Sequence, residues 1–145
     1  MSEQLEDFDD VSQYGIDADR RDQLLARQDE CAVVWSTADG WPVGVMHIYV
    51  WQNGSFWVTC MPERKRVPAL RARPQSSVIV AFPDEQTVTA KTLATVHEHG
   101  SDHHDWFYRA LAEKVLPSQP ENVRALGEDA WVERLDSPGR LSLIH

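Results

Sequence analysis

The sequence predicts a mainly β fold, in which six or seven antiparallel strands form a closed or nearly closed barrel with helices at its periphery. Short apolar runs rich in β-branched and aromatic residues recur along the chain and are separated by turn signals such as Asn53-Gly54. Only one to three segments have apolar residues at helical spacing. Closing such a sheet protects its edges, and a chain of 145 residues is long enough for one domain with one core.

Residues 1–15 contain several acidic residues and no basic one, and we expect an acidic N-terminal arm there. The folded domain is expected over residues 16–145. Its first helix is predicted over residues 17–30, with Asp17 as a suitable N-cap because its carboxylate can accept from free backbone N–H groups.

Seven segments are predicted to be strands. Their bounds are residues 31–37, 41–51, 56–59, 77–82, 87–96, 130–135 and 140–144. Turns are expected at Ala38-Asp39-Gly40, Asn53-Gly54 and Ser137-Pro138-Gly139. Residues 102–116 are predicted to form an amphipathic helix, and residues 121–126 could add a short one.

Charge and composition limit the classes of function. The formal net charge is −9, so general binding to nucleic acids or anionic membranes is not expected. The chain begins without an apolar segment and has no apolar run of about 20 residues, which favours a soluble, cytoplasmic protein. Cys31 and Cys60 lack CxxC spacing and are expected to be buried, reduced thiols.

Basic residues are concentrated between two predicted strands. Five of the 14 Lys and Arg residues lie there, at Arg64, Lys65, Arg66, Arg71 and Arg73. Guanidinium groups match phosphate oxygens, and a helix start offers free N–H groups, so the segment suits an anion. The alternative interpretation is a solvated basic helix that pairs with acidic neighbours.

Histidines and tryptophans give weaker indications of a binding site. His47 lies in a predicted strand, where a core or surface imidazole is favoured over a proton donor or haem ligand. His97, His99, His103 and His104 resemble a metal cluster, but their polar turn favours a solvated loop. Trp35 and Trp57 are expected in the core, whereas Trp41, Trp51 and Trp106 could line a flat cofactor or a dimer seam.

The order of these elements resembles the pyridoxamine 5'-phosphate oxidase-like FMN-binding split-barrel superfamily, which includes flavin and deazaflavin oxidoreductases. The resemblance is carried by residues 36–42 (Ser-Thr-Ala-Asp-Gly-Trp-Pro), 54–59 (Gly-Ser-Phe-Trp-Val-Thr), 64–66 (Arg-Lys-Arg) and 70–74 (Leu-Arg-Ala-Arg-Pro). It implies a six-stranded split barrel that forms a homodimer with two cofactor sites at the subunit interface. Members of this superfamily bind FMN, the deazaflavin coenzyme F-420, or in some branches haem or a bilin.

The resemblance also implies roles for particular residues. Arg64, Lys65 and Arg66 would hold the cofactor phosphate, and Thr59 would contact the phosphate or the ribityl chain. The second strand would lie against the flavin ring at Val45, Met46 and His47.

The implied function is an FMN- or F-420-dependent oxidoreductase that transfers a hydride to a small, unidentified substrate. No pair of titratable residues stands out as acid and base, which fits chemistry carried by a cofactor. Two alternatives remain open. One is a non-catalytic protein that binds or sequesters haem, a bilin or a flavin, and the other is a dimeric scaffold without a cofactor.

Overall fold

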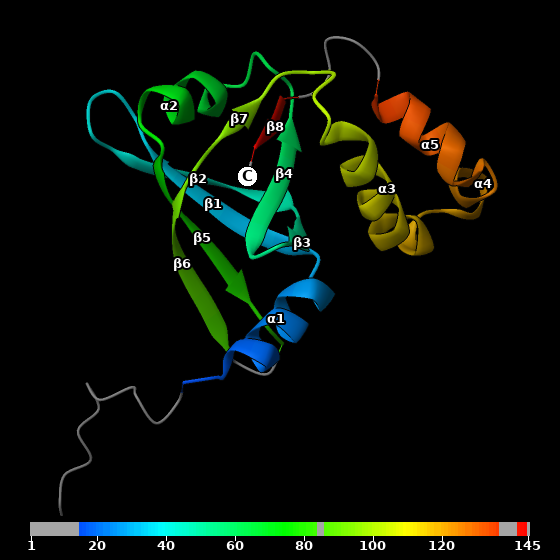
Figure 1. Cartoon of the computed structure of the whole chain (residues 1–145), viewed down its shortest axis with the longest axis horizontal. Helices are drawn as coiled ribbons and strands as arrows, with labels where there is room; N and C mark the ends of the chain where they lie inside the picture. Colours follow the sequence, from blue (N-terminus) through cyan, green and yellow to red (C-terminus); the bar gives the residue numbers. More distant parts are fainter. Residues whose placement is uncertain (1–14, 84–85, 137–141, 145) are drawn as a thin grey trace, which may run out of the picture.

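Two antiparallel four-stranded sheets form the centre of the protein (Figure 1). The structure is a computed structural model that describes residues 15–83, 86–136 and 142–144, the last three by their backbone only. In the first sheet the order is β2-β1-β5-β6, with bounds Pro42–Ile48, Glu30–Ser36, Gln75–Ala81 and Thr87–Leu93. In the second it is β3-β4-β8-β7, with bounds Val50–Gln52, Ser55–Cys60, Ser142–Ile144 and Val96–His97.

Helices make up more of the described chain than the sequence predicts. They are α1 (Ala18–Arg27), α2 (Arg66–Ala72), α3 (His104–Val115), the 3-10 turn η2 (Leu116–Ser118), α4 (Glu121–Arg124) and α5 (Gly127–Leu135). Figure 1 shows α3, α4 and α5 together on one side of the second sheet. None of the helices within the described residues is long and apolar enough to cross a membrane.

The predicted turns at Asn53-Gly54 and Gly40 and the predicted N-cap at Asp17 are confirmed. Asn53 and Gly54 both have positive φ, 52° and 72°, as a tight turn between twisted strands requires, and they join β3 to β4. Gly40 has φ 89° in the turn between β1 and β2. At the start of α1, the Asp17 Oδ1 accepts a hydrogen bond of 2.8 Å from the backbone N–H of Arg20.

The strand predicted over residues 41–51 is instead two strands in different sheets. The break is at Tyr49, which is fully buried. Its hydroxyl donates to the Leu25 carbonyl at 2.6 Å, and its own carbonyl accepts from Lys114 Nζ at 2.8 Å. These contacts fix the residue at which the chain passes from the first sheet to the second.

The predicted strand over residues 130–135 is wrong, because this segment is the helix α5. Trp131, Val132 and Leu135 follow a helical spacing and pack in the same apolar cluster as Phe107 and Leu111 of α3. The strand predicted over residues 140–144 is present as β8. The turn predicted at residues 137–139 and the arm over residues 1–14 lie outside the described residues.

Two apolar cores share the strand β4. Phe56, Val58 and Cys60 face the first core, between the two sheets and α1 and α2. Trp57 faces the second core, which β4 forms with α3 and α5. The strand is therefore buried on both faces, and its position is held from both sides.

Candidate functional site

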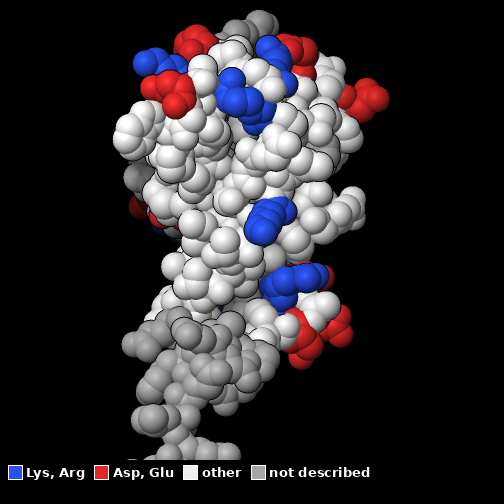
Figure 2. All heavy atoms as spheres, turned by 90° about the vertical axis from the view of Figure 1, so that its left-hand side faces the viewer, with Lys and Arg blue, Asp and Glu red and all other residues white. Residues whose placement is uncertain are grey.

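The predicted phosphate-binding residues lie where β4 leads into α2. The turn is closed by hydrogen bonds from the Arg64 N–H to the Met61 carbonyl at 3.1 Å and from the Val67 N–H to the Arg64 carbonyl at 2.9 Å. Arg64 and Lys65 are exposed and Arg66 is half-buried. Figure 2 shows Lys and Arg side chains at the α2 end of the molecule, with acidic side chains beside them. Because α2 has only seven residues, the charge here comes mainly from side chains.

Arg66 lies close enough to His47 of β2 to affect its titration. His47 is only 9% exposed. Burial, assisted by the positive charge of Arg66, lowers the pKa of His47 to about 4, so the imidazole is neutral at pH 7. Nε2 of His47 and Nε of Arg66 are both enclosed, and no described residue makes a hydrogen bond with either atom. An enclosed polar atom without a partner is costly, so the pair marks a place where a bound group or water would complete the bonding.

Cys60 lies at the same place, at the end of β4. Burial raises the pKa of its thiol, while the nearby charge and hydrogen bonding of Arg66 oppose this shift. Cys31, opposite His47 in the β1–β2 register, has its pKa raised to about 12, mainly by burial. Both thiols are buried and free, as predicted, and they are poor nucleophiles because little thiolate forms near pH 7.

The residues predicted against a flavin ring lie on opposite faces of β2. His47 is buried and Val45 is half-buried on the inner face, whereas Met46, 59% exposed, is on the outer face. β2 is also an edge strand: it pairs with β1 on one side, and no strand within the described residues pairs with its other side. Free backbone groups along such an edge can form hydrogen bonds with a planar ligand.

Thr59 lies on the face of β4 opposite to Cys60. It follows the alternation that places Trp57 in the second core, and it contacts the Tyr108 hydroxyl. Burial raises the pKa of Tyr108. The structure therefore brings His47, Cys60 and Arg66 together, leaves Arg64 and Lys65 at the surface nearby, and places Thr59 across the strand.

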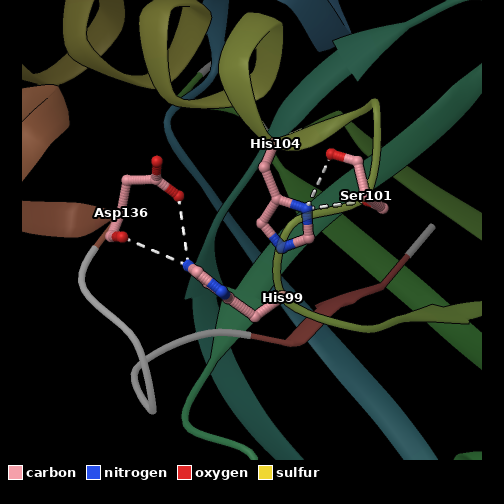
Figure 3. Close-up of polar contacts among 4 residues, drawn as sticks. All are labelled: His99, Ser101, His104 and Asp136. Atoms are coloured by element: carbon pink, nitrogen blue, oxygen red, sulfur yellow. Dashed lines mark hydrogen bonds and ion pairs between the residues drawn. The ribbon is translucent and has the colours of Figure 1, made fainter.

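The histidine-rich segment is a solvated loop only in part: His99 is exposed, whereas His97 and His103 are half-buried. His104 is buried, and its Nδ1 lies 2.7 Å from the Ser101 hydroxyl (Figure 3). His99 Nε2 lies 3.2 Å from Oδ1 of Asp136 and 3.1 Å from the Asp136 carbonyl (Figure 3).

Two further imidazoles of this segment pack on an indole. The rings of His97 and His103 are 5.6 Å and 5.1 Å from the ring of Trp57. Within residues 15–83, 86–136 and 142–144, no group of three or more His, Cys, Asp or Glu side chains is arranged to hold a metal ion. Aromatic packing thus accounts for the placement of these two rings.

Part of the outer face of the first sheet is apolar. Met46 pairs with Ala32, and Ala32 pairs in turn with Ile79, so these side chains share one face. Ile48 and Met46 are both exposed on it. Figure 2 looks onto this side and shows a mostly uncharged area between the charged ends of the molecule, interrupted by basic side chains. An apolar sheet face of this kind is typical of a surface that another molecule covers.

The sequence did not indicate two residues that contact the predicted site residues. It did not point to Cys60 or Tyr108, and it did not connect His47 with Arg66. The only signal for Cys60 is its position directly before the basic turn, and His47 and Arg66 meet through packing between segments that are distant in the sequence.

Comparison by sequence gives no relatives: no protein-family model matches the chain, and no curated protein is similar to it. Comparison by structure gives many. The haem storage protein HutZ from Vibrio cholerae is 14% identical, with a TM-score of 0.66 over 88% of this chain and 87% of its own. An F420 reductase is 17% identical, with a TM-score of 0.60 over 85% and 89%. A candidate pyridoxamine 5'-phosphate oxidase from Listeria innocua is 12% identical, with a TM-score of 0.62 over 87% and 89%. At these identities the likeness shows a shared fold.

Proposed function

We propose that this chain, which has the pyridoxamine 5'-phosphate oxidase-like fold, is a homodimeric oxidoreductase that uses FMN or, alternatively, the deazaflavin coenzyme F-420. Its two sheets form the halves of a split barrel. Arg64, Lys65 and Arg66 hold the cofactor phosphate, and the ring lies against β2 at Val45, Met46 and His47. Thr59 contacts the polar chain between phosphate and ring. The substrate is a small molecule that accepts a hydride.

The observation that carries this proposal is the enclosed pair of His47 and Arg66 beside two exposed cations. The protein has 23 acidic and 14 basic residues, so a group of three cations here reverses the general negative charge locally. His47 Nε2 makes no hydrogen bond to Arg66, and the orphaned Nε atom of Arg66 gives the guanidinium a hydrogen bond still to make. These residues fit a phosphate.

The edge of β2 supports the position of the ring. A flavin or deazaflavin supplies the hydride chemistry when it is bound, and the protein contributes position, hydrogen bonds and a dry surface. Along β2, the backbone of residues 45–47 lies at an open edge, and His47 closes its inner side. The neutral imidazole keeps this side of the site uncharged at pH 7.

The apolar part of the outer face of the first sheet supports the homodimer. A second copy that covered this face would bury Met46 and Ile48, two large apolar side chains now exposed to water. It would also place a partner next to the edge of β2, where the ring is proposed. Light scattering on the purified protein should give twice the monomer mass, and a monomeric mass at about 50 μM would contradict the homodimer.

The experiment that tests the cofactor begins with the absorbance spectrum of protein purified under native conditions, followed by fluorescence titrations with FMN and with F-420. The variant Arg64→Ala/Arg66→Ala should bind the preferred cofactor about 100-fold more weakly, because two charge-assisted hydrogen bonds are lost. The control Arg20→Ala/Arg27→Ala removes the same charge from exposed positions of α1 and should bind normally. Equal affinities for all three proteins, or no quenching of either cofactor by the wild type, would refute the proposal.

The second candidate is a non-catalytic protein that holds haem, a bilin or a flavin. It is supported by the neutral imidazole of His47, whose Nε2 has no hydrogen-bond partner among the described residues, and by the shared fold with a haem storage protein. A Soret band on addition of haem that disappears in His47→Ala would favour it. Unchanged haem binding in His47→Ala would remove His47 as the ligand.

A further inference from the structure

The outward-pointing residues of the first sheet, whose four strands are fully described, include one base and one acid. The base is Lys91 of β6, opposite Ser77 of β5, and the acid is Glu30 of β1, opposite Ile48 of β2. Both charged side chains are exposed. Neither makes an ion pair with another described residue at N···O distances up to 4.0 Å. Each charge is therefore available to a partner that approaches this face.

A second copy of the chain on this face would cover the two charges together with the exposed side chains of Met46 and Ile48. A charge that is removed from water is costly unless an opposite charge meets it. In a two-fold interface, a contact of one residue with another is always repeated with the roles exchanged. One base and one acid on the same face can therefore neutralise each other twice across such an interface.

The strand register shows where the two-fold axis has to lie for this to happen. Ile79 of β5 is opposite Ala32 of β1 on one side and Thr89 of β6 on the other. Lys91 is two residues from Thr89, and Glu30 is two residues from Ala32 towards the other end of the sheet. With strands about 4.8 Å apart and residues about 3.4 Å apart, both charges lie about 8 Å from Ile79, in opposite directions. An axis in the plane of the interface, crossing Ile79 at right angles to the line between the charges, places Lys91 of each copy on Glu30 of the other.

The same axis matches the exposed apolar side chains of the face. On a flat sheet with these spacings, Leu93 of one copy falls within about 3 Å of Ile48 of the other in projection, and Met46 falls equally close to Val34. Leu93 and Met46 are 71% and 59% exposed, so both would gain apolar cover. Gly44 lies on the axis itself, where the absence of a side chain lets the two copies approach closely. One placement thus satisfies the charges and the apolar groups.

We propose that two copies of this chain pack through the outer faces of their first sheets about this axis, held in register by two reciprocal Lys91–Glu30 ion pairs. This placement rests on the proposed homodimer and adds to it the axis and the pair of residues that selects it. The apolar contacts supply most of the affinity. The ion pairs select the register, because a shifted placement would cover two ammonium groups and two carboxylates without partners.

The test is a charge swap, followed by sedimentation velocity of the full-length protein over a range of concentrations. Lys91→Glu and Glu30→Lys each bring like charges together twice, and each should weaken the dimer at least about tenfold. The double variant Lys91→Glu/Glu30→Lys restores opposite charges and should recover the dimer to within about threefold of the wild type. Arg124→Glu and Glu113→Lys make the same changes of net charge at exposed positions of α4 and α3 and should dimerise normally.

The outcomes separate this placement from the homodimer itself. A monomeric wild type would refute the homodimer and the placement together. A dimer that persists in both single reversals, or that is not recovered in the double variant, would leave the homodimer standing and overturn the placement. Circular dichroism checks that each variant is folded. If a single reversal unfolds the protein, recovery of a folded dimer in the double variant still supports the reciprocal pairs, and a failure to recover overturns them.

Discussion

The two faces of β4 border two cores that are filled in different ways. On one face, Trp57 packs in a core built from the large rings of Phe107 and Tyr108, with the buried imidazole of His104 beside them. On the other face, Phe56 and Val58 border a core that contains a cavity of about 350 Å³.

The difference shows how one strand can serve both stability and binding. The helical side has little free volume at fully buried positions, so a change of side-chain size there has no space to occupy or must leave a hole. The first core already contains free volume, so it should tolerate changes of size. The cofactor site that we propose lies beside the first core, and the aromatic core holds β4 in position for it.

The largest expected effect is the loss of a ring from the helical core. Phe107→Ala should lower the free energy of unfolding by about 3–5 kcal/mol, because Phe107 is 0% exposed and its removal leaves a cavity. Val78→Ala, at the wall of the cavity in the first core, should cost only about 1.5 kcal/mol, the transfer of two methylene equivalents. Urea denaturation of both variants measures the difference, and equal losses would mean that the two cores are equally well packed.

The next effect concerns low pH, and it is specific to His47 on the inner face of the first sheet. His47 has a folded pKa of about 4 against 6.5 for an unperturbed histidine, so the unfolded state takes up a proton first as the pH falls. The contribution of His47 to the free energy of unfolding is complete above pH 6.5. It declines as the pH falls towards 4, by up to about 3 kcal/mol.

The variant His47→Gln isolates this contribution from that of the carboxylates. Guanidinium denaturation at pH 7.5 and at pH 4 should show a smaller loss of stability in His47→Gln than in the wild type. If both proteins lose the same free energy over this range, His47 is not held neutral by its surroundings.

The smallest effects are expected from two substitutions that replace an alanine with a leucine, one in each core. Ala112→Leu adds three carbon atoms at a fully buried position of the helical core and should destabilise the protein by about 1–3 kcal/mol. Ala90→Leu adds the same atoms next to the cavity and should be neutral or stabilise by less than about 1 kcal/mol. Thermal unfolding followed by circular dichroism compares the two, and a destabilised Ala90→Leu would show that the cavity cannot accept a side chain.

Local sequence signals predicted local structure well. Asn53-Gly54 and Asp17 act through hydrogen bonds and φ angles within four residues, and both occur as expected. The segment at residues 130–135 was mistaken for a strand because Trp131 and Val132 favour strands, although their spacing with Leu135 is helical. The division of the second strand at Tyr49 depends on partners at Leu25 and Lys114, far away in the sequence, and no local pattern reveals it.

The candidate site was also predictable only where its signal is local in the sequence. The concentration of basic residues before α2 is visible in the sequence, because an excess of cations in an acidic chain stands out without a structure. Arg66 is the half-buried one of the three, and its position near His47 and Cys60 depends on packing between segments that are distant in the sequence. The burial of His104 likewise depends on the packing of α3, which places the Tyr108 ring 5.6 Å from its imidazole.

Tyr49 joins three parts of the chain that are far apart in sequence. Through one residue, the Leu25 carbonyl of α1 and the Lys114 ammonium of α3 are tied to the passage between the two sheets. Neither α1 nor α3 can separate from the sheets without exposing this residue. Amide hydrogen exchange should therefore show α1 and α3 opening together with the strands, as one cooperative unit, rather than fraying in advance of them.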